Sequence, residues 1–118
     1  MAALKKNNQA TQLDPIDHIA ISVKDVKTAV EWYTKTFKCE IEYQDETWAF
    51  LRFSNCKLAL VIPDQHPPHI AFVSPNAEQY GRLKKHRDGT ESTYVKDSDG
   101  NSVEVIAPYT VSPKGNNR

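Results

Sequence analysis

The chain has 118 residues, 39% of them hydrophobic, and its fifteen Lys and Arg balance fifteen Asp and Glu for a formal net charge of zero at pH 7. This length suits a single domain with one core, and the balanced charge gives no field that would favour nucleic acid or an anionic membrane, so we expect a small-molecule partner instead. The longest apolar run, residues 58–62, is far shorter than the ~20 residues that span a membrane, and residues 1–12 lack the apolar stretch of a signal peptide, which predicts a cytoplasmic protein.

The first half of the chain predicts one strand, one helix and three more strands. β-branched residues favour a strand at 16–23. Asp25 can cap a helix over 26–38, where apolar residues recur with a spacing near 3.6. Short polar turns, of the kind that join antiparallel neighbours, separate three further strands, at residues 40–44, 48–53 and 57–62.

A second unit repeats this order after residues 63–68, whose three prolines predict a stiff link. It begins with a strand at 69–74 and continues with a poorer helix at 76–87, which contains Gly81. Two strands complete the unit, at residues 91–96 and 102–107. Since little more than a turn fits between the helix and the first of these strands, we expect the counterpart of the strand at 40–44 to be lost or shortened.

The domain boundaries follow from composition. Polar segments predict disordered tails over residues 1–13 and 110–118, which leaves one folded domain over residues 14–109. The proline-rich link divides this domain into two modules, 14–63 and 68–109. Two modules in so short a chain must share one core or exchange elements with a partner chain.

The tripeptide His-Ile-Ala occurs at the start of both units, with its histidine at His18 and at His69. When the ends of the last strands of the two units are laid over one another, Glu104 falls opposite Ala59. A site on the pseudo-twofold axis would then have four equivalent positions, three of them able to bind a metal. Two imidazoles and one carboxylate are a common ligand set for a divalent ion with open coordination positions.

The neighbouring residues are assigned from strand alternation. Alternation leaves open whether Glu104 faces inward or outward, and it turns Asp17 away from His18, which makes Asp17 a poor candidate to orient that imidazole. We expect His66 and His86 to lie on the surface. The two cysteines form no CxxC pair, so neither a disulfide framework nor a cysteine zinc site is predicted.

The motifs together resemble the vicinal oxygen chelate superfamily, which includes glyoxalase I, methylmalonyl-CoA epimerase, fosfomycin-resistance enzymes, extradiol dioxygenases and bleomycin-resistance proteins. The similar segments are the opening strand 17–23, the helix containing residues 29–37, and the turn and strand at 96–104. The resemblance covers about residues 14–109. It implies an α+β fold in which paired βαβββ modules form a cupped, half-open sheet, with the second module shortened, often completed across a homodimer.

By the same resemblance, His18, His69 and Glu104 match ligand positions for one divalent metal ion per chain. The nitrogen and oxygen donors leave its identity open among Zn, Fe, Mn, Ni, Co and Mg. Binding should weaken as the pH falls through the histidine range near ~6.5. Ala59 stands where glyoxalase I and methylmalonyl-CoA epimerase carry Glu or Gln, so simple glyoxalase I activity is not expected, and three ligands fit the fosfomycin and extradiol branches better.

Two functions follow from the resemblance. The first is a metal-dependent enzyme whose small substrate chelates the ion through adjacent oxygens, by lyase, isomerase, addition or dioxygenase chemistry; Tyr94 is the candidate acid or base, and Ser92 a candidate substrate contact. The alternative is a metal-free small-molecule binding protein of the bleomycin-resistance type, in which Trp48, Phe50 and Tyr94 stack on the ligand. An exposed sheet edge, which a second copy could cover, predicts a homodimer.

Overall fold

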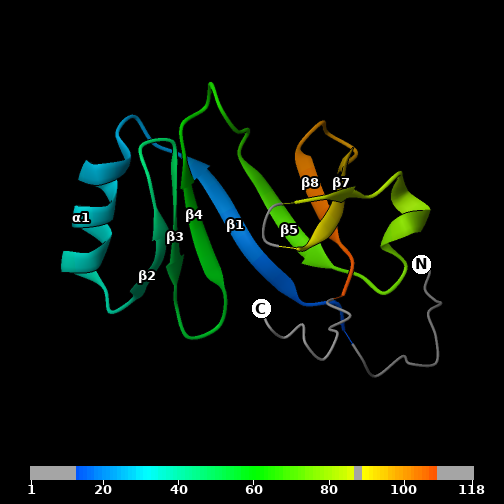
Figure 1. Cartoon of the computed structure of the whole chain (residues 1–118), viewed down its shortest axis with the longest axis horizontal. Coiled ribbons are helices and arrows are strands. Elements are labelled where there is room, and N and C mark those ends of the chain that lie inside the picture. Colours follow the sequence, from blue (N-terminus) through cyan, green and yellow to red (C-terminus); the bar gives the residue numbers. More distant parts are fainter. Residues whose placement is uncertain (1–12, 87–88, 109–118) are drawn as a thin grey trace.

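A computed structural model describes residues 13–86 and 89–108, which form an open eight-stranded sheet with one α-helix and a 3-10 helix (Figure 1). The expected tails, apart from Leu13, and the last residue of the expected domain, Tyr109, lie outside the described residues. The elements are, in chain order, β1 (Ile16–Ser22), α1 (Val26–Thr36), β2 (Glu40–Gln44), β3 (Trp48–Arg52), β4 (Lys57–Val61), β5 (His69–Val73), η2 (Ala77–Tyr80), β6 (Lys84–Lys85), β7 (Glu91–Lys96) and β8 (Ser102–Ile106).

The sheet consists of two similar halves that meet at its centre. Its strand order is β2-β3-β4-β1-β5-β8-β7-β6, so the order from the centre outward is the same on both sides. The first strand of each half pairs in parallel with the last, β1 with β4 and β5 with β8, whereas β1 and β5 pair antiparallel with each other. This arrangement confirms the expected α+β fold with two related modules.

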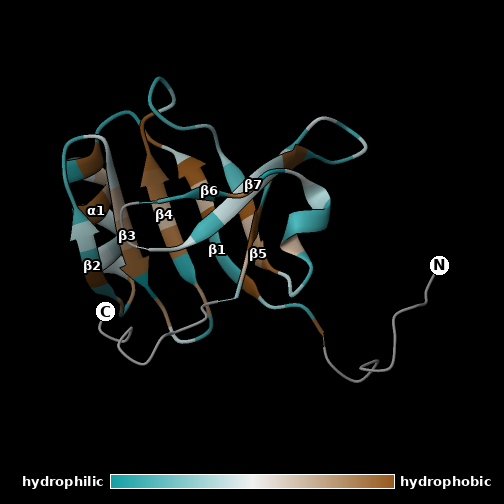
Figure 2. Cartoon of the chain, turned by 45° about the vertical axis from the view of Figure 1, so that its right-hand side comes forward, coloured by the Kyte–Doolittle hydropathy of each residue, from teal (hydrophilic) through white to brown (hydrophobic). Residues whose placement is uncertain are grey.

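The helix α1 covers one face of the first half. Its N-terminus is capped by Asp25, whose carboxylate accepts hydrogen bonds from the backbone N–H and the hydroxyl of Thr28. Val26 and Val30 pack against a buried cluster of β3 and β4 side chains that includes Leu51. Hydrophobic stretches of α1, β3 and β4 lie together in Figure 2. The opposite face of this half carries a second cluster, around Ala20 and Ala59.

The expected helix at 76–87 is wrong, because of its described residues, 76–86, only Ala77–Tyr80 is helical, as a single 3-10 turn. Gly81 explains the break: its φ is +156°, and a Cβ there would lie 2.7 Å from Thr93 Oγ1. The chain passes close to β7 at this point and then pairs with it as the two-residue strand β6. The counterpart of β2 is therefore shortened, as expected, but not lost.

No helix among the described residues is long and apolar enough to cross a membrane.

Candidate metal centre

Three buried donor atoms converge on the face of the sheet opposite α1. The distance from His18 Nε2 to His69 Nε2 is 3.2 Å, and Glu104 Oε1 lies 3.4 Å from His18 Nε2 and 3.3 Å from His69 Nε2. Donor atoms bound to one ion at ~2.0–2.2 Å lie roughly 3–3.5 Å apart in tetrahedral or octahedral geometry. The group therefore fits one divalent metal ion and could hold it.

The sheet register brings these three residues together. His18 on β1 pairs with Ala71 on β5, and Ala71 pairs with Glu104 on β8, so the three side chains lie in a row on one face. His69 pairs with Ala20, one step along the same face. Ala71 is fully buried, and its small side chain leaves the space between the ligands open. Pairing thus answers what alternation left open: Glu104 faces the site.

The fourth equivalent position is apolar. Ala20 pairs with Ala59 in the first half as Ala71 pairs with Glu104 in the second, so Ala59 is the structural counterpart of Glu104. This agrees with the superposition of the two strand ends. Ala59 is buried and lies opposite Phe50 on the neighbouring strand. Among the described residues, three side chains therefore supply possible metal ligands at this site.

In each histidine, Nε2 faces the other donor atoms, and Nδ1 on the other side of the ring contacts an oxygen that orients the ring. The Nδ1–H of His18 donates to Asp17 Oδ2 at 2.8 Å, and the Nδ1–H of His69 donates to the backbone oxygen of Pro67 at 2.8 Å. Such contacts fix the ring and leave the Nε2 lone pair for the metal. The expectation that Asp17 turns away from His18 is wrong, because the β1–β5 register shifts between Ile16 and His18 and the irregularity breaks the alternation at Asp17.

Without a bound metal ion, the electrostatics of the triad favour a proton on His18. Burial lowers the pKa of His18, but hydrogen bonds with Asp17 and Glu104 outweigh burial and raise it to about 9. Burial raises the pKa of Glu104, yet its contacts with both histidine rings and the hydrogen bond from Ser92 hold that pKa well below its usual range. A metal ion entering this site must therefore displace a proton from His18.

The second oxygen of Glu104 is also engaged. The Ser92 hydroxyl donates to Glu104 Oε2 at 2.7 Å, and His86 Nε2 lies 2.7 Å from the same hydroxyl. Ser92 was expected to contact the substrate, and this stays a prediction. Its burial does not favour such a contact, because the residue is only 1% exposed. His86, expected on the surface, is an additional residue of the site. The two-residue strand β6 that leads to His86 is too short to recognise from its sequence.

Aromatic rings extend from the triad toward the outer strands of the first half. The Phe50 ring lies edge-on to His18 with centroids 5.0 Å apart, Trp48 is 5.3 Å from Phe50, and Tyr43 is 4.7 Å from Trp48. Trp48 and Phe50 are half-buried beside Ala59 on the site face of the sheet. Together these rings offer a wall on which an apolar or planar group could rest.

Tyr94 borders the triad on the other side. Its ring lies edge-on to His69 with centroids 5.3 Å apart, and the residue pairs across the strands with Glu104. Tyr94 is 48% exposed. Burial of its hydroxyl, together with the Glu104 carboxylate, raises the pKa of Tyr94 above its ordinary value of 10.0. The phenol is therefore protonated at neutral pH and can donate a hydrogen bond or a proton, but it is not a base there.

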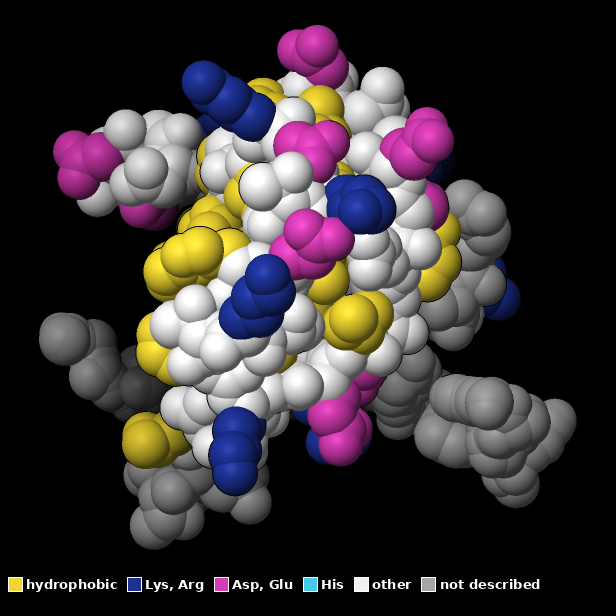
Figure 3. Space-filling model, turned by 90° about the vertical axis from the view of Figure 1, so that its left-hand side faces the viewer, with side chains coloured by type: hydrophobic (Ala, Val, Ile, Leu, Met, Phe, Trp, Pro, Cys, Tyr) yellow, Lys and Arg dark blue, Asp and Glu magenta, His cyan; other side chains and the backbone are white. Residues whose placement is uncertain are grey.

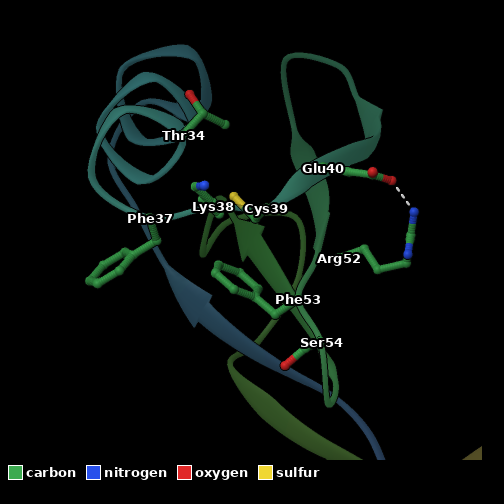
Figure 4. Close-up of a pocket in the computed structure, with 8 residues that line it drawn as sticks. All are labelled: Thr34, Phe37, Lys38, Cys39, Glu40, Arg52, Phe53 and Ser54. Carbon is green, nitrogen blue, oxygen red and sulfur yellow. Dashed lines mark hydrogen bonds and ion pairs between the residues drawn. The ribbon is translucent and has the colours of Figure 1, made fainter.

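A separate hollow of about 490 Å³ lies between the end of α1 and the end of β3 (Figure 4). Phe37, Cys39 and Phe53 are among its lining residues, and an ion pair between Arg52 and Glu40 lies at its side. None of the expected site residues lines it.

The chain matches the model of the Glyoxalase/Bleomycin resistance protein/Dioxygenase superfamily over residues 15–86, and it belongs to this superfamily. The resemblance inferred from the sequence motifs is thereby confirmed. Among curated proteins, no significant sequence match is found.

Solved structures of low sequence identity share the fold. Methylmalonyl-CoA epimerase from Mycobacterium tuberculosis has a TM-score of 0.67 at 16% identity, covering 88% of this chain and 92% of that one. A variant of the Streptomyces coelicolor epimerase in complex with 2-nitronate-propionyl-CoA has a TM-score of 0.64 at 19% identity, covering 86% and 99%. A hypothetical protein from Bacillus halodurans has a TM-score of 0.66 at 15% identity, covering 86% and 99%. At these identities the likeness concerns the fold alone.

Proposed function

We propose that the protein is a metal-dependent enzyme of this superfamily, acting on a small substrate that chelates the metal through adjacent oxygens. The observation that carries the proposal is the triangle of buried donor atoms from His18, His69 and Glu104, with sides of 3.2–3.4 Å. All three ligands are oriented by an oxygen behind them, which is the arrangement that metal-binding side chains need.

One divalent ion bound there supplies a Lewis acid that stabilises negative charge on substrate oxygens. The residues of the chain then bind and orient the substrate around that point. Since Ala59 supplies neither a fourth ligand nor a base, coordination positions of the ion would be left for adjacent oxygens of the substrate. This favours rearrangement or addition over glyoxalase I chemistry.

The two sides of the triad would bind different parts of the substrate. An apolar part of the substrate would rest on Trp48 and Phe50, which lie on the first-half side of His18. The oxygens would then face Tyr94, whose protonated hydroxyl can donate a hydrogen bond or a proton to one of them. The substrate class is accordingly a small molecule with adjacent oxygens at one end and an apolar group at the other.

A second candidate function, a metal-free small-molecule binding protein, is supported by the aromatic wall. Stacking on Trp48 and Phe50 needs no metal, and the histidines would then be structural. The two functions predict different behaviour after treatment with a chelator. The enzyme loses ligand binding together with its ion, whereas the binding protein retains it.

The direct test measures metal content in protein purified without added ions and again after loading with zinc, manganese or iron. We expect about one ion per chain, and we expect His69→Ala to lose most of it while keeping the fold. His66→Ala, which changes a histidine outside the triad, serves as the matched control. If His69→Ala binds as many metal ions per chain as the wild type, the metal is not bound at this site.

We also propose a homodimer. All five residues of the edge strand β2 are exposed, and Trp32 and Phe37 near it are 55% and 51% exposed. On this end of the molecule, Figure 3 shows hydrophobic side chains among charges of both signs. Within the described residues, β2 pairs only with β3, and a sheet edge of this kind with exposed aromatic rings nearby favours association. Light scattering should give about twice the chain mass of 13.4 kDa, and a value equal to the chain mass would refute the dimer.

We further propose that residues 14–109 fold as one domain, because both halves belong to one sheet joined through β1 and β5. Urea unfolding should then give one transition for both halves. Two separate transitions would contradict the single domain.

A further inference from the structure

The contact behind Glu104 differs from those behind the two histidines. Asp17 and the backbone of Pro67 each act alone on a ring nitrogen. Glu104 is instead held by Ser92, whose hydroxyl oxygen lies 2.7 Å from both Glu104 Oε2 and His86 Nε2. The chain thus places a third histidine one hydrogen bond behind a carboxylate ligand.

The direction of these hydrogen bonds follows from the chemistry of the groups. An ionised carboxylate only accepts, so the Ser92 hydroxyl proton points to Glu104 Oε2. The Ser92 oxygen can then only accept from His86, which requires the His86 proton on Nε2. His86 Nε2 is 3.8 Å from Glu104 Oε2, so His86 acts on the carboxylate through Ser92.

We infer that His86, through Ser92, is a positioning residue that keeps Glu104 a one-oxygen ligand of the metal. This deepens the proposed function and rests on it. With Oε2 bound to Ser92, only Oε1 faces the two histidine nitrogens, at 3.4 and 3.3 Å. A carboxylate that bound through both oxygens would use two coordination positions. Holding Oε2 therefore keeps open a position that the second oxygen of a chelating substrate needs.

The remnant strand β6 explains how His86 reaches Ser92. Lys84 pairs with Ser92, and His86, two residues further on, returns to the same face. Two backbone hydrogen bonds hold it there: the His86 N–H donates to the Thr90 oxygen at 2.7 Å, and the Gly89 N–H donates to the His86 oxygen at 2.9 Å. The shortened second module thus retains the two strand residues that position a side chain behind the site.

The test compares His86→Gln with His86→Asn, which differ by one methylene. The glutamine amide nitrogen reaches the place of His86 Nε2 and can donate to Ser92, whereas the asparagine amide is too short. We expect His86→Asn to bind zinc about 10-fold more weakly than wild type and His86→Gln to bind it with near wild-type affinity. Ser92→Ala should lose about 10- to 100-fold. Ser102→Ala is the control, since its hydroxyl contacts Lys96 at 3.3 Å and not Glu104.

Visible absorption of the cobalt-loaded protein reads the coordination directly. If Oε2 is released in His86→Asn, Glu104 binds through both oxygens, the coordination number rises, and the visible bands weaken; in His86→Gln they should match wild type. Equal affinity and equal spectra in all three proteins overturn the inference while leaving the metal site intact. Equal losses in His86→Gln and His86→Asn also overturn it, because the donated hydrogen bond is then not the cause. A wild-type protein that takes up no metal overturns the proposed function, and the inference with it.

Discussion

Raising the pH from 7 to 8 should strengthen metal binding about tenfold, because a proton on His18 competes with the ion. In the metal-free site, the pKa of His18 is about 9, since hydrogen bonds with Asp17 and Glu104 outweigh the effect of burial. A metal binds only the deprotonated ring. Metal affinity should therefore depend on pH up to about 9, and not only in the ordinary histidine range near ~6.5.

The size of the effect follows from the fraction of deprotonated His18. With a pKa of about 9, this fraction is about 1% at pH 7 and about 10% at pH 8, so apparent affinity rises about tenfold between them. Affinity should level off above pH 9. An unshifted histidine would be mostly deprotonated at pH 7, and affinity would change by less than about twofold over the same interval.

Stability of the metal-free protein should change in the opposite direction. The folded-state pKa of His18 is raised above the unfolded value of 6.5, so the stabilisation is fully present below about pH 6.5 and is lost as the pH rises through about 9. Thermal unfolding of the metal-free protein should therefore occur at lower temperature at pH 9 than at pH 6.5.

Calorimetric titration with zinc, in two buffers of different ionisation enthalpy, measures both affinity and proton release. We expect about one proton released per ion at pH 7. Asp17→Asn keeps an oxygen that can accept from His18 but removes the charge, so its pH dependence should be shallower. Asp14→Asn, which removes an exposed carboxylate three residues before Asp17 in the chain, should behave like wild type. Affinity that is flat from pH 7 to 8 without proton release would refute the reasoning.

Three further predictions concern single side chains. Leu51→Ala removes a fully buried core side chain and should lower the free energy of unfolding by ~2–5 kcal/mol in urea titrations; a loss under ~1 kcal/mol would contradict the packing described. Gly81→Ala should cost ~1–3 kcal/mol, because its φ of +156° disfavours a side chain and its Cβ would lie 2.7 Å from Thr93 Oγ1. Gly100→Ala is strained by a φ of +88° but meets no neighbouring atom, so it should cost less, and the reverse order would be contrary evidence. Tyr94→Phe should reduce kcat on a chelating substrate and leave metal content unchanged; an unaltered kcat would show that Tyr94 only packs.

The sequence by itself determined the elements whose signals are local. β-branched residues, helical periodicity and short polar turns predicted β1, α1 and the three strands that follow, because each of these signals lies within a continuous segment. The internal repeat of the sequence also pointed to the triad of His18, His69 and Glu104. His18 and His69 occupy equal positions in the two modules, and Glu104 replaces Ala59, so the repeat marked positions that only the folded sheet brings together.

Only the tertiary structure decided the rest, because the causes lie between segments far apart in sequence. The helix expected at 76–87 is interrupted where Gly81 must pass close to Thr93 on β7. Asp17 reaches His18 because pairing with β5 shifts register beside it, which no single strand reveals. His86 joins the site through a two-residue strand that is stable only when paired with β7. Register and close approach are properties of pairs of strands, so a pattern within one strand does not contain them.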